Sequence, residues 1–126
     1  MPFFSVVIPT YNRADILPET SIIIRAFNEE QWLPDVFAAL AKQHYRDFEV
    51  LLVDSGSVDR TREIAAEYGA RIVRLRSEDF TFGHSLNVGV SEARGRLIAI
   101  LSAHAIPASD AWLERLVAPL RQDDVA

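Results

Sequence analysis

A short apolar run that ends in an acidic turn constrains the fold of this sequence more than any other feature. Residues 50–53, Val-Leu-Leu-Val, are too few for a helix and are typical of a strand buried on both faces. Residues 54–57, Asp-Ser-Gly-Ser, are typical of a turn, and a helical pattern begins near Arg60. Because ligands of open α/β sheets bind outside the carboxyl ends of the strands, Asp54 is placed for ligand contact. A purely structural role in the turn is the alternative for Asp54, and it is the interpretation that we favour for Asp59.

Apolar strands and amphipathic helices alternate along the chain from Ser21 onward. A chain with this alternation is expected to form a parallel sheet with right-handed crossover connections. We therefore predict an α/β fold that is Rossmann-like, with three α/β/α layers around a mostly parallel four-stranded sheet. The strands are expected to begin at residue 21 and to cover 50–53, 71–75 and 97–101, and the helices to cover 28–43, 60–69, 85–93 and 108–120.

Residues 1–20 contain an extra copy of the first strand and its turn. Ser5-Val-Val-Ile-Pro-Thr-Tyr-Asn matches Ser21-Ile-Ile-Ile-Arg-Ala-Phe-Asn, an offset of 16 residues. Both copies cannot occupy one position in a sheet, and the second is favoured because only after Asn28 is there room for the helix that follows. We expect residues 1–20 to be an edge strand, a partner-seeking arm, or a remnant of a fusion or of another reading frame.

The composition excludes several classes of protein. A formal net charge of −5 argues against nucleic acid as a partner, because phosphate binding needs a basic face. The chain has no cysteine, so disulfides and thiol chemistry are excluded. No apolar run approaches the roughly 18 residues of a membrane span, and the start lacks the features of a signal peptide. A cytoplasmic protein is therefore the default expectation.

Three stretches resemble the nucleotide-sugar-binding half of family 2 glycosyltransferases, which have the GT-A fold. Residues 53–59, Val-Asp-Ser-Gly-Ser-Val-Asp, are similar to the family's Val-Asp-x-Gly-Ser-x-Asp motif. Either residues 9–13 or residues 25–29 resemble the family's first turn, and the spacing to the next motif favours 25–29. The resemblance covers residues 21–120. The helix and turn before the family's metal motif are matched by Asn87, Gly89, Ala93 and Gly95.

The resemblance implies transfer of a sugar from a nucleotide-sugar to an acceptor hydroxyl, with inversion, in polysaccharide or glycoconjugate synthesis such as that of the cell wall. Residues 21–126 would be its nucleotide-sugar-binding GT-A subdomain, and residues 1–20 a duplicated strand–turn start. The acceptor site and the acidic general base normally lie in the second half of the domain, which this chain is expected to lack, so the catalytic residues are unknown. The alternatives are a non-catalytic nucleotide-binding module and a truncated gene product.

The same resemblance implies donor contacts at the carboxyl edge of the sheet. A carboxylate at Asp54 can accept from a base N–H or from ribose hydroxyls, and Phe27 can stack near the base. Burial is the alternative for Phe27, and a helix N-cap role is the alternative for Asn28. His84 precedes a helix N-terminus, which attracts anions, and a solvated loop position is its alternative. The residues expected to contact the nucleotide-sugar are Arg25, Phe27, Asn28, Glu29, Asp54, Ser55, His84 and Ser102.

Ser102-Ala103-His104 occupies the position of the family's Asp-x-Asp metal motif. His104 is thus the candidate metal ligand, for a divalent cation such as Mn²⁺ or Mg²⁺. Imidazole suits Mn²⁺ and softer ions, whereas Mg²⁺ prefers oxygen ligands. Three interpretations are open: His104 ligates a cation carried mainly by the diphosphate, it hydrogen-bonds the diphosphate directly as an imidazolium, or it has no function.

The partners implied are a nucleotide-sugar donor and a saccharide or lipid-linked acceptor. A narrow sheet is expected to expose an apolar edge, so self-association into a homo-oligomer is a further expectation. Peripheral membrane association is expected only of the full-length enzyme.

Overall fold

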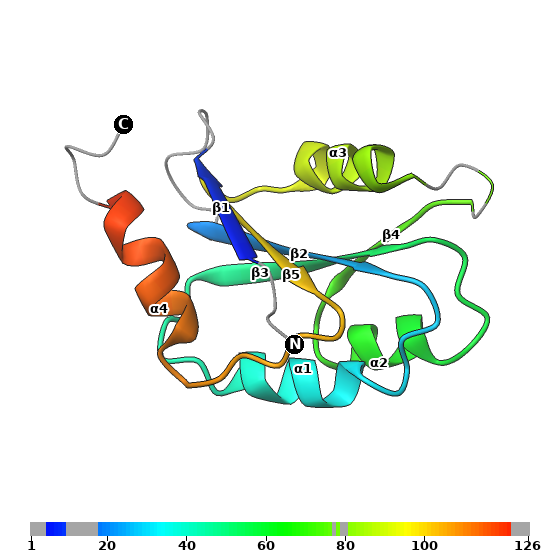
Figure 1. Cartoon of the computed structure of the whole chain (residues 1–126), viewed down its shortest axis with the longest axis horizontal. Coiled ribbons are helices and arrows are strands. Elements are labelled where there is room, and N and C mark those ends of the chain that lie inside the picture. The colour runs from blue at the N-terminus through cyan, green and yellow to red at the C-terminus, as the bar shows by residue number, and fades with distance from the viewer. Residues whose placement is uncertain (1–4, 10–17, 77, 79–80, 122–126) are drawn as a thin grey trace.

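Five strands form the mixed sheet around which the protein is organised (Figure 1). The structure, a computed structural model, describes residues 5–9, 18–76, 78 and 81–121. The strand order is β1-β5-β2-β3-β4; β2, β3, β4 and β5 are parallel, and β1 pairs antiparallel with β5. The strand bounds are Ser5–Pro9 for β1, Thr20–Ala26 for β2, Phe48–Asp54 for β3, Arg71–Arg74 for β4 and Leu97–Ser102 for β5.

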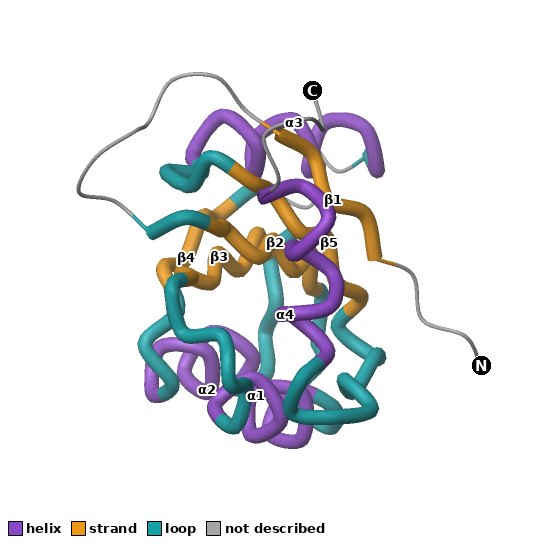
Figure 2. Tube along the Cα trace, turned by 90° about the vertical axis from the view of Figure 1, so that its left-hand side faces the viewer, coloured by secondary structure: helices purple, strands orange, loops and turns teal. Residues whose placement is uncertain are grey.

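Helices cover both faces of this sheet. α3 (Phe82–Glu92) lies on one face, whereas α1 (Leu33–Ala41) and α2 (Thr61–Glu67) lie on the other, as Figure 2 shows. α4 (Trp112–Val117) continues into the 3-10 helix η2 (Ala118–Arg121) and packs in the same core cluster as α1. The predicted α/β/α layering around four parallel strands is confirmed, and the antiparallel strand β1 is an addition to it.

The two copies of the repeated segment take different positions in the sheet. β2, from the second copy, lies between β3 and β5 and is parallel to both. Its Ile22, Ile23 and Ile24 are fully buried, as the uninterrupted apolar run indicates. β1, from the first copy, lies at the sheet edge, with Ser5 opposite Leu101 of β5. The structure confirms that the second copy holds the central position, whereas the division of the chain at residue 20 stays a prediction.

Alternation along β2 divides the core into two parts. Ile22 and Ile24 pack in the cluster that contains the buried residues of α1, α2 and α4. Ile23 faces the other way and packs with Val53 and with the partly buried Val90 of α3. Gly89 lets α3 approach this face closely, because a Cβ there would lie 2.8 Å from Ile23 Cγ2. Helices thus cover both faces of the parallel strands, and only the ends of the strands are left for polar loops.

α1 begins later than the sequence pattern predicts. Asn28 has a φ of +52°, in the left-handed region, so the helix cannot run through it. A turn follows, closed by a 3.0 Å hydrogen bond from Trp32 N to Glu29 O, and Trp32 takes the N-cap position of α1. The interpretation of Asn28 as the helix N-cap is therefore wrong.

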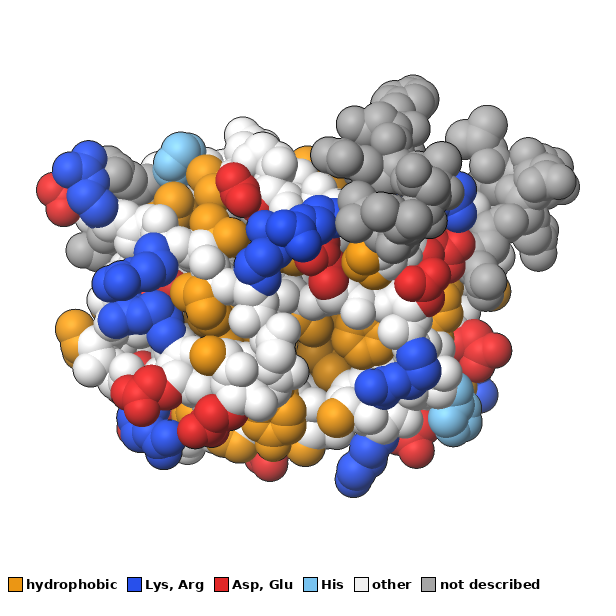
Figure 3. Space-filling model, turned by 180° about the vertical axis from the view of Figure 1, so that it is seen from behind, with side chains coloured by type: hydrophobic (Ala, Val, Ile, Leu, Met, Phe, Trp, Pro, Cys, Tyr) orange, Lys and Arg blue, Asp and Glu red, His pale blue; other side chains and the backbone are white. Residues whose placement is uncertain are grey.

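Charged side chains of both signs share the surface. In the view of Figure 3, Lys and Arg side chains lie among Asp and Glu side chains over much of that face. Within the described ranges, no helix has the length and apolar character needed to cross a membrane.

Candidate functional site

Three parallel strands end side by side at one edge of the sheet, here called the carboxyl edge. Ala26 at the end of β2 pairs with Asp54 at the end of β3. On the other side of β2, Arg25 pairs with Ser102 at the end of β5. The loops that leave β2, β3 and β5 therefore begin next to one another. Most of the donor contacts implied by the sequence lie on these loops.

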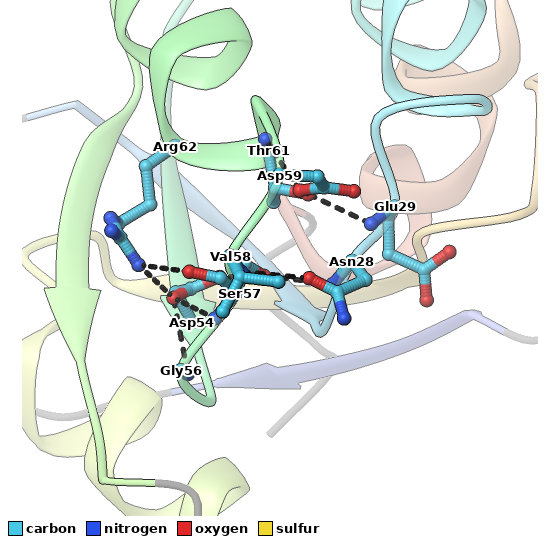
Figure 4. Close-up of polar contacts among 9 residues, drawn as sticks. All are labelled: Asn28, Glu29, Asp54, Gly56, Ser57, Val58, Asp59, Thr61 and Arg62. Atoms are coloured by element: carbon cyan, nitrogen blue, oxygen red, sulfur yellow. Dashed lines mark hydrogen bonds and ion pairs between the residues drawn. The ribbon is translucent and has the colours of Figure 1, made fainter.

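Hydrogen bonds join the loop of residues 26–30 to the loop of residues 54–61, and we call these the paired loops (Figure 4). Asn28 N donates to Ser57 Oγ at 2.8 Å, and Asn28 Oδ1 accepts from Val58 N at 2.9 Å. These contacts use the backbone and side chain of Asn28 to connect two strand ends. Further bonds run from Glu29 N to Thr61 Oγ1 (2.8 Å), from Ser55 N to Ala26 O (3.0 Å), from Glu30 N to Asp59 Oδ2 (3.3 Å) and from Arg60 N to Glu30 Oε1 (2.8 Å).

The carboxylate of Asp54 is turned into the protein. Asp54 is fully buried, and its Oδ2 accepts from Gly56 N at 3.2 Å and from Ser57 N at 3.0 Å. Arg62 Nη1 also donates to Oδ2, at 2.9 Å. Gly56 has a φ of +94°, which a glycine adopts at little cost and which closes this tight turn. Asp54 thus anchors the turn in this structure, and its contact with a donor stays a prediction.

Asp59 satisfies backbone groups at the start of α2. Its Oδ1 accepts from Thr61 N at 2.9 Å and from the Thr61 hydroxyl, and its Oδ2 accepts from Glu30 N. Burial acts to raise the pKa of Asp59, but the hydrogen bonds from Thr61 and Glu30 outweigh it and hold the pKa below its ordinary value. The structural interpretation of Asp59 is confirmed.

A second cluster joins the loop after β2 to the loop after β5. His104 Nε2 hydrogen-bonds Glu29 Oε1, and His104 N donates to Ser102 Oγ at 3.1 Å. The ring of Trp32 lies 5.3 Å from the His104 ring, centroid to centroid, at an interplanar angle of 32°. The side chain of His104 is 47% exposed and that of Glu29 is 19% exposed. The imidazole is therefore held on one side while part of it faces solvent.

The remaining residues in and just after β2 and β3 that are expected to contact the donor differ in solvent exposure. Phe27 is 50% exposed at the carboxyl edge, so the interpretation of Phe27 as a buried core residue is wrong. Arg25 is partly buried, and this burial lowers the pKa of its guanidinium. Ser55 is buried, and its Oγ has no hydrogen-bond partner within the described ranges.

His84 lies apart from these loops. It is exposed in the first turn of α3, on the opposite face of the sheet from α1, and its N donates to Thr81 Oγ1 at 3.0 Å. α3 begins three residues before the predicted residue 85, with Thr81 as its N-cap, so the interpretation of His84 as a loop residue before the helix is wrong. The structure therefore brings Glu29, Ser102 and His104 together, but it places Asp54 and His104 in separate hydrogen-bonded clusters rather than in one direct contact.

The donor atoms at this edge are too few for a metal held by the protein alone. In the part of the chain that the structure describes, no cluster of three or more His, Cys, Asp or Glu side chains could hold a metal ion. His104 and Glu29 supply one imidazole and one carboxylate, already hydrogen-bonded to each other. This donor set fits a divalent cation carried mainly by a diphosphate, with the imidazole as its protein ligand.

Sequence reasoning missed Trp32 and Arg62. Trp32 follows Glu29 by three residues and is 39% exposed, and Arg62 lies in the first turn of the helix after the acidic turn. The signal for Arg62 was a basic residue close behind a buried acid. No signal in the sequence pairs Glu29 or Trp32 with His104, because more than seventy residues separate them.

An open, mostly parallel sheet with helices on both faces places the domain in the doubly wound α/β class, in which ligands bind outside the carboxyl ends of the strands. Comparison with known sequences is more specific. The pattern of the family described as Glycosyl transferase family 2 matches residues 21–126. The chain belongs to this family.

Individual relatives agree with this assignment. Glycosyltransferase AglE of Haloferax volcanii is 34% identical over 110 residues, which cover 82% of this chain and 36% of that protein. The uncharacterized glycosyltransferase EpsJ of Bacillus subtilis is 29% identical over 113 residues, which cover 87% of this chain and 33% of that protein. The chain thus spans about a third of the length of these relatives.

Solved structures share the fold. TarS of S. aureus, in complex with UDP-GlcNAc, is 26% identical with a TM-score of 0.63, over 68% of this chain and 26% of that chain. Glucosyl-3-phosphoglycerate synthase of Mycobacterium tuberculosis, in complex with Mn²⁺, UDP and glucosyl-3-phosphoglycerate, is 23% identical with a TM-score of 0.68, over 85% of this chain and 41% of that chain.

Proposed function

We propose that this chain is the donor-binding part of a glycosyltransferase and holds a nucleotide-sugar at the carboxyl edge. The observation that carries the proposal is the register that aligns the ends of β2, β3 and β5 in a chain of this family. Ligands of open α/β sheets bind at such an edge. The UDP-GlcNAc bound by TarS and the UDP bound by the mycobacterial synthase support the choice of ligand class.

The described residues suggest a division of tasks. The exposed ring of Phe27 offers a face on which a nucleobase stacks, with the paired loops as its rigid support. The ion pair of Asp54 with Arg62 shapes the loop after β3, and a direct donor contact of Asp54 stays a prediction. Ser55 Oγ, buried and without a hydrogen-bond partner among the described residues, is available to a ligand atom that enters between the paired loops. The imidazole of His104 faces the diphosphate.

A divalent cation, when bound, would neutralise charge on the leaving diphosphate. His104 is the residue of this chain that would contact it, and Ser102 and Glu29 fix the position of His104. Ser102 and His104, in place of two acids, also favour a second candidate, a nucleotide-binding module without catalysis.

The proposal extends to the reaction of the whole protein. It would transfer the sugar to a saccharide or lipid-linked acceptor in polysaccharide or glycoconjugate synthesis, in the cytoplasm. The PGL/p-HBAD biosynthesis glycosyltransferase of Mycobacterium bovis, 33% identical over 106 residues, supports this process class.

Calorimetric titration of the folded chain with UDP-, GDP- and dTDP-sugars, with and without Mn²⁺, tests donor binding. We expect one nucleotide class to bind, and Phe27→Ala to weaken binding about tenfold through lost stacking. Tyr68→Ala is the matched control, since Tyr68 is a 47% exposed aromatic residue at the C-terminal end of α2, whereas the paired loops meet the N-terminal end of that helix.

The same titration separates the roles of His104. His104→Ala is expected to weaken binding about tenfold, whereas His44→Ala, which removes an exposed imidazole after α1, is not. If the loss appears only with Mn²⁺ present, His104 acts through a cation; if it appears in EDTA as well, the contact is direct. A folded wild-type chain that gives no heat with any donor would refute the proposed function.

A further inference from the structure

We infer that Glu29 positions the His104 imidazole, and that it does not itself contact the nucleotide-sugar. The inference changes the role expected for Glu29, which the family resemblance placed among the donor contacts. The part that this Glu29–His104 contact plays in donor binding rests on the function proposed above. The contact between the two side chains stands independently of it.

The hydrogen-bond chemistry defines which ring atom is engaged. An ionised carboxylate only accepts hydrogen bonds, so the proton of the contact lies on His104 Nε2 and Glu29 Oε1 accepts it. Nδ1 is then the ring nitrogen left for a ligand. A carboxylate behind an imidazole in this way fixes the ring and makes its other nitrogen a better ligand.

Both partners are themselves held in place. Glu29 N donates to Thr61 Oγ1 at 2.8 Å, which fixes its backbone to the start of α2. His104 N donates to Ser102 Oγ at 3.1 Å at the end of β5, and Trp32 lies 5.3 Å from the imidazole. The contact therefore connects the loops of β2, β3 and β5. Only 19% of the Glu29 side chain is exposed, against 47% for His104, so the imidazole is the more accessible group.

A positioning role of Glu29 and a simple effect of its charge predict changes in donor affinity of opposite sign when Glu29 is replaced by alanine. Glu29→Ala removes a negative charge near the site of an anionic diphosphate, which by Coulomb attraction alone would strengthen binding. If Glu29 instead holds the imidazole, the same variant frees the ring and weakens binding. Glu63→Ala is the charge-matched control, because Glu63 is an exposed acid in the first turn of α2.

A double-mutant cycle for UDP-sugar binding carries the test. We expect Glu29→Ala and His104→Ala each to weaken binding about tenfold, and the double variant to bind no more weakly than His104→Ala alone. Glu29→Gln, whose amide oxygen still accepts from Nε2–H, should recover most of the affinity. Additive losses, or tighter binding by Glu29→Ala, would overturn the inference.

A second measurement does not depend on any nucleotide. In an NMR spectrum of the free chain, the His104 ring N–H should appear as a downfield, slowly exchanging resonance that is lost in Glu29→Ala and in His104→Ala. It should persist in His44→Ala and His84→Ala. A missing resonance in the wild type would overturn the inference. If the resonance is present but no nucleotide-sugar binds, the proposed function is refuted, whereas the contact between Glu29 and His104 remains supported.

Discussion

Arg62 donates a hydrogen bond at 2.9 Å to the carboxylate of Asp54, which is fully buried. The same Nη1 donates to Ser57 O at 2.9 Å. One guanidinium thus ties α2 to the turn that follows β3. A buried carboxylate needs such partners, because burial without them costs several kcal/mol.

Removing the buried acid is expected to destabilise the fold more than removing its partly exposed partner, Arg62. Asp54→Ala should lower the free energy of unfolding by about 3 kcal/mol, because the turn N–H groups and Arg62 lose their acceptor. Arg62→Ala should cost about 1 kcal/mol, since Asp54 keeps its bonds from Gly56 and Ser57. Urea titration measures both values. Equal losses, or a larger loss for Arg62→Ala, would contradict this account of the turn.

Asp59 is expected to make stability depend on acid pH. Its pKa in the folded chain is lowered, so its ionised form stabilises the fold above the ordinary pKa of about 3.9, and this contribution is lost as pH falls through the lower folded value. Asp59→Asn should therefore flatten the decline of stability below about pH 4. Thermal unfolding between pH 3 and pH 7 measures the slope; a curve with the wild-type slope would contradict the assignment.

Local apolar patterns predicted the sheet well, because the runs at 22–24, 51–53 and 97–99 are short and buried. The repeat was assigned correctly for a topological reason, since a parallel strand needs a crossover helix after it, and the sequence leaves room for that helix only after the second copy, where α1 lies. The antiparallel pairing of β1 with β5 had no local signal, because the pairing joins segments about ninety residues apart.

The polar site was harder to predict, because its contacts also join segments that lie far apart in the sequence. Asn28 resembles a helix cap locally, but its side chain bonds Val58 across the paired loops, and it takes a left-handed conformation. The local sequence also does not show that Arg62 and the turn N–H groups bond the Asp54 carboxylate, and its donor contact stays a prediction. Hydrogen bonds between distant loops outcompete local preferences at such positions, and one sequence does not display them.

Two glycines should respond to alanine in opposite directions. A Cβ at Gly95 would lie 2.7 Å from Ser21 N and 2.7 Å from Thr20 C, which are backbone atoms, so Gly95→Ala should cost about 2 kcal/mol or more. A Cβ at Gly83 would meet no atom within 4 Å among the described residues, apart from its chain neighbours and the nearby backbone of α3, and Gly83 is helical, so Gly83→Ala should gain up to about 1 kcal/mol. Urea titration of both variants provides the comparison. Two losses of similar size would refute the packing argument at Gly95.

Gln43 should be the main polar connection between α1 and the start of α4. It is 2% exposed; its Nε2 donates to Ser109 O at 2.8 Å, and its Oε1 accepts from Leu113 N at 3.0 Å. Gln43→Ala leaves both backbone groups without this partner and should cost about 2 kcal/mol. Gln43→Glu keeps the acceptor and loses the donor, and it sets a carboxylate beside a carbonyl oxygen, so it should cost at least as much. Hydrogen exchange at Leu113 N separates the variants, because its protection should fall in Gln43→Ala and be retained better in Gln43→Glu. Unchanged protection in Gln43→Ala would mean that packing of the apolar face of α4, and not Gln43, holds the helix in place.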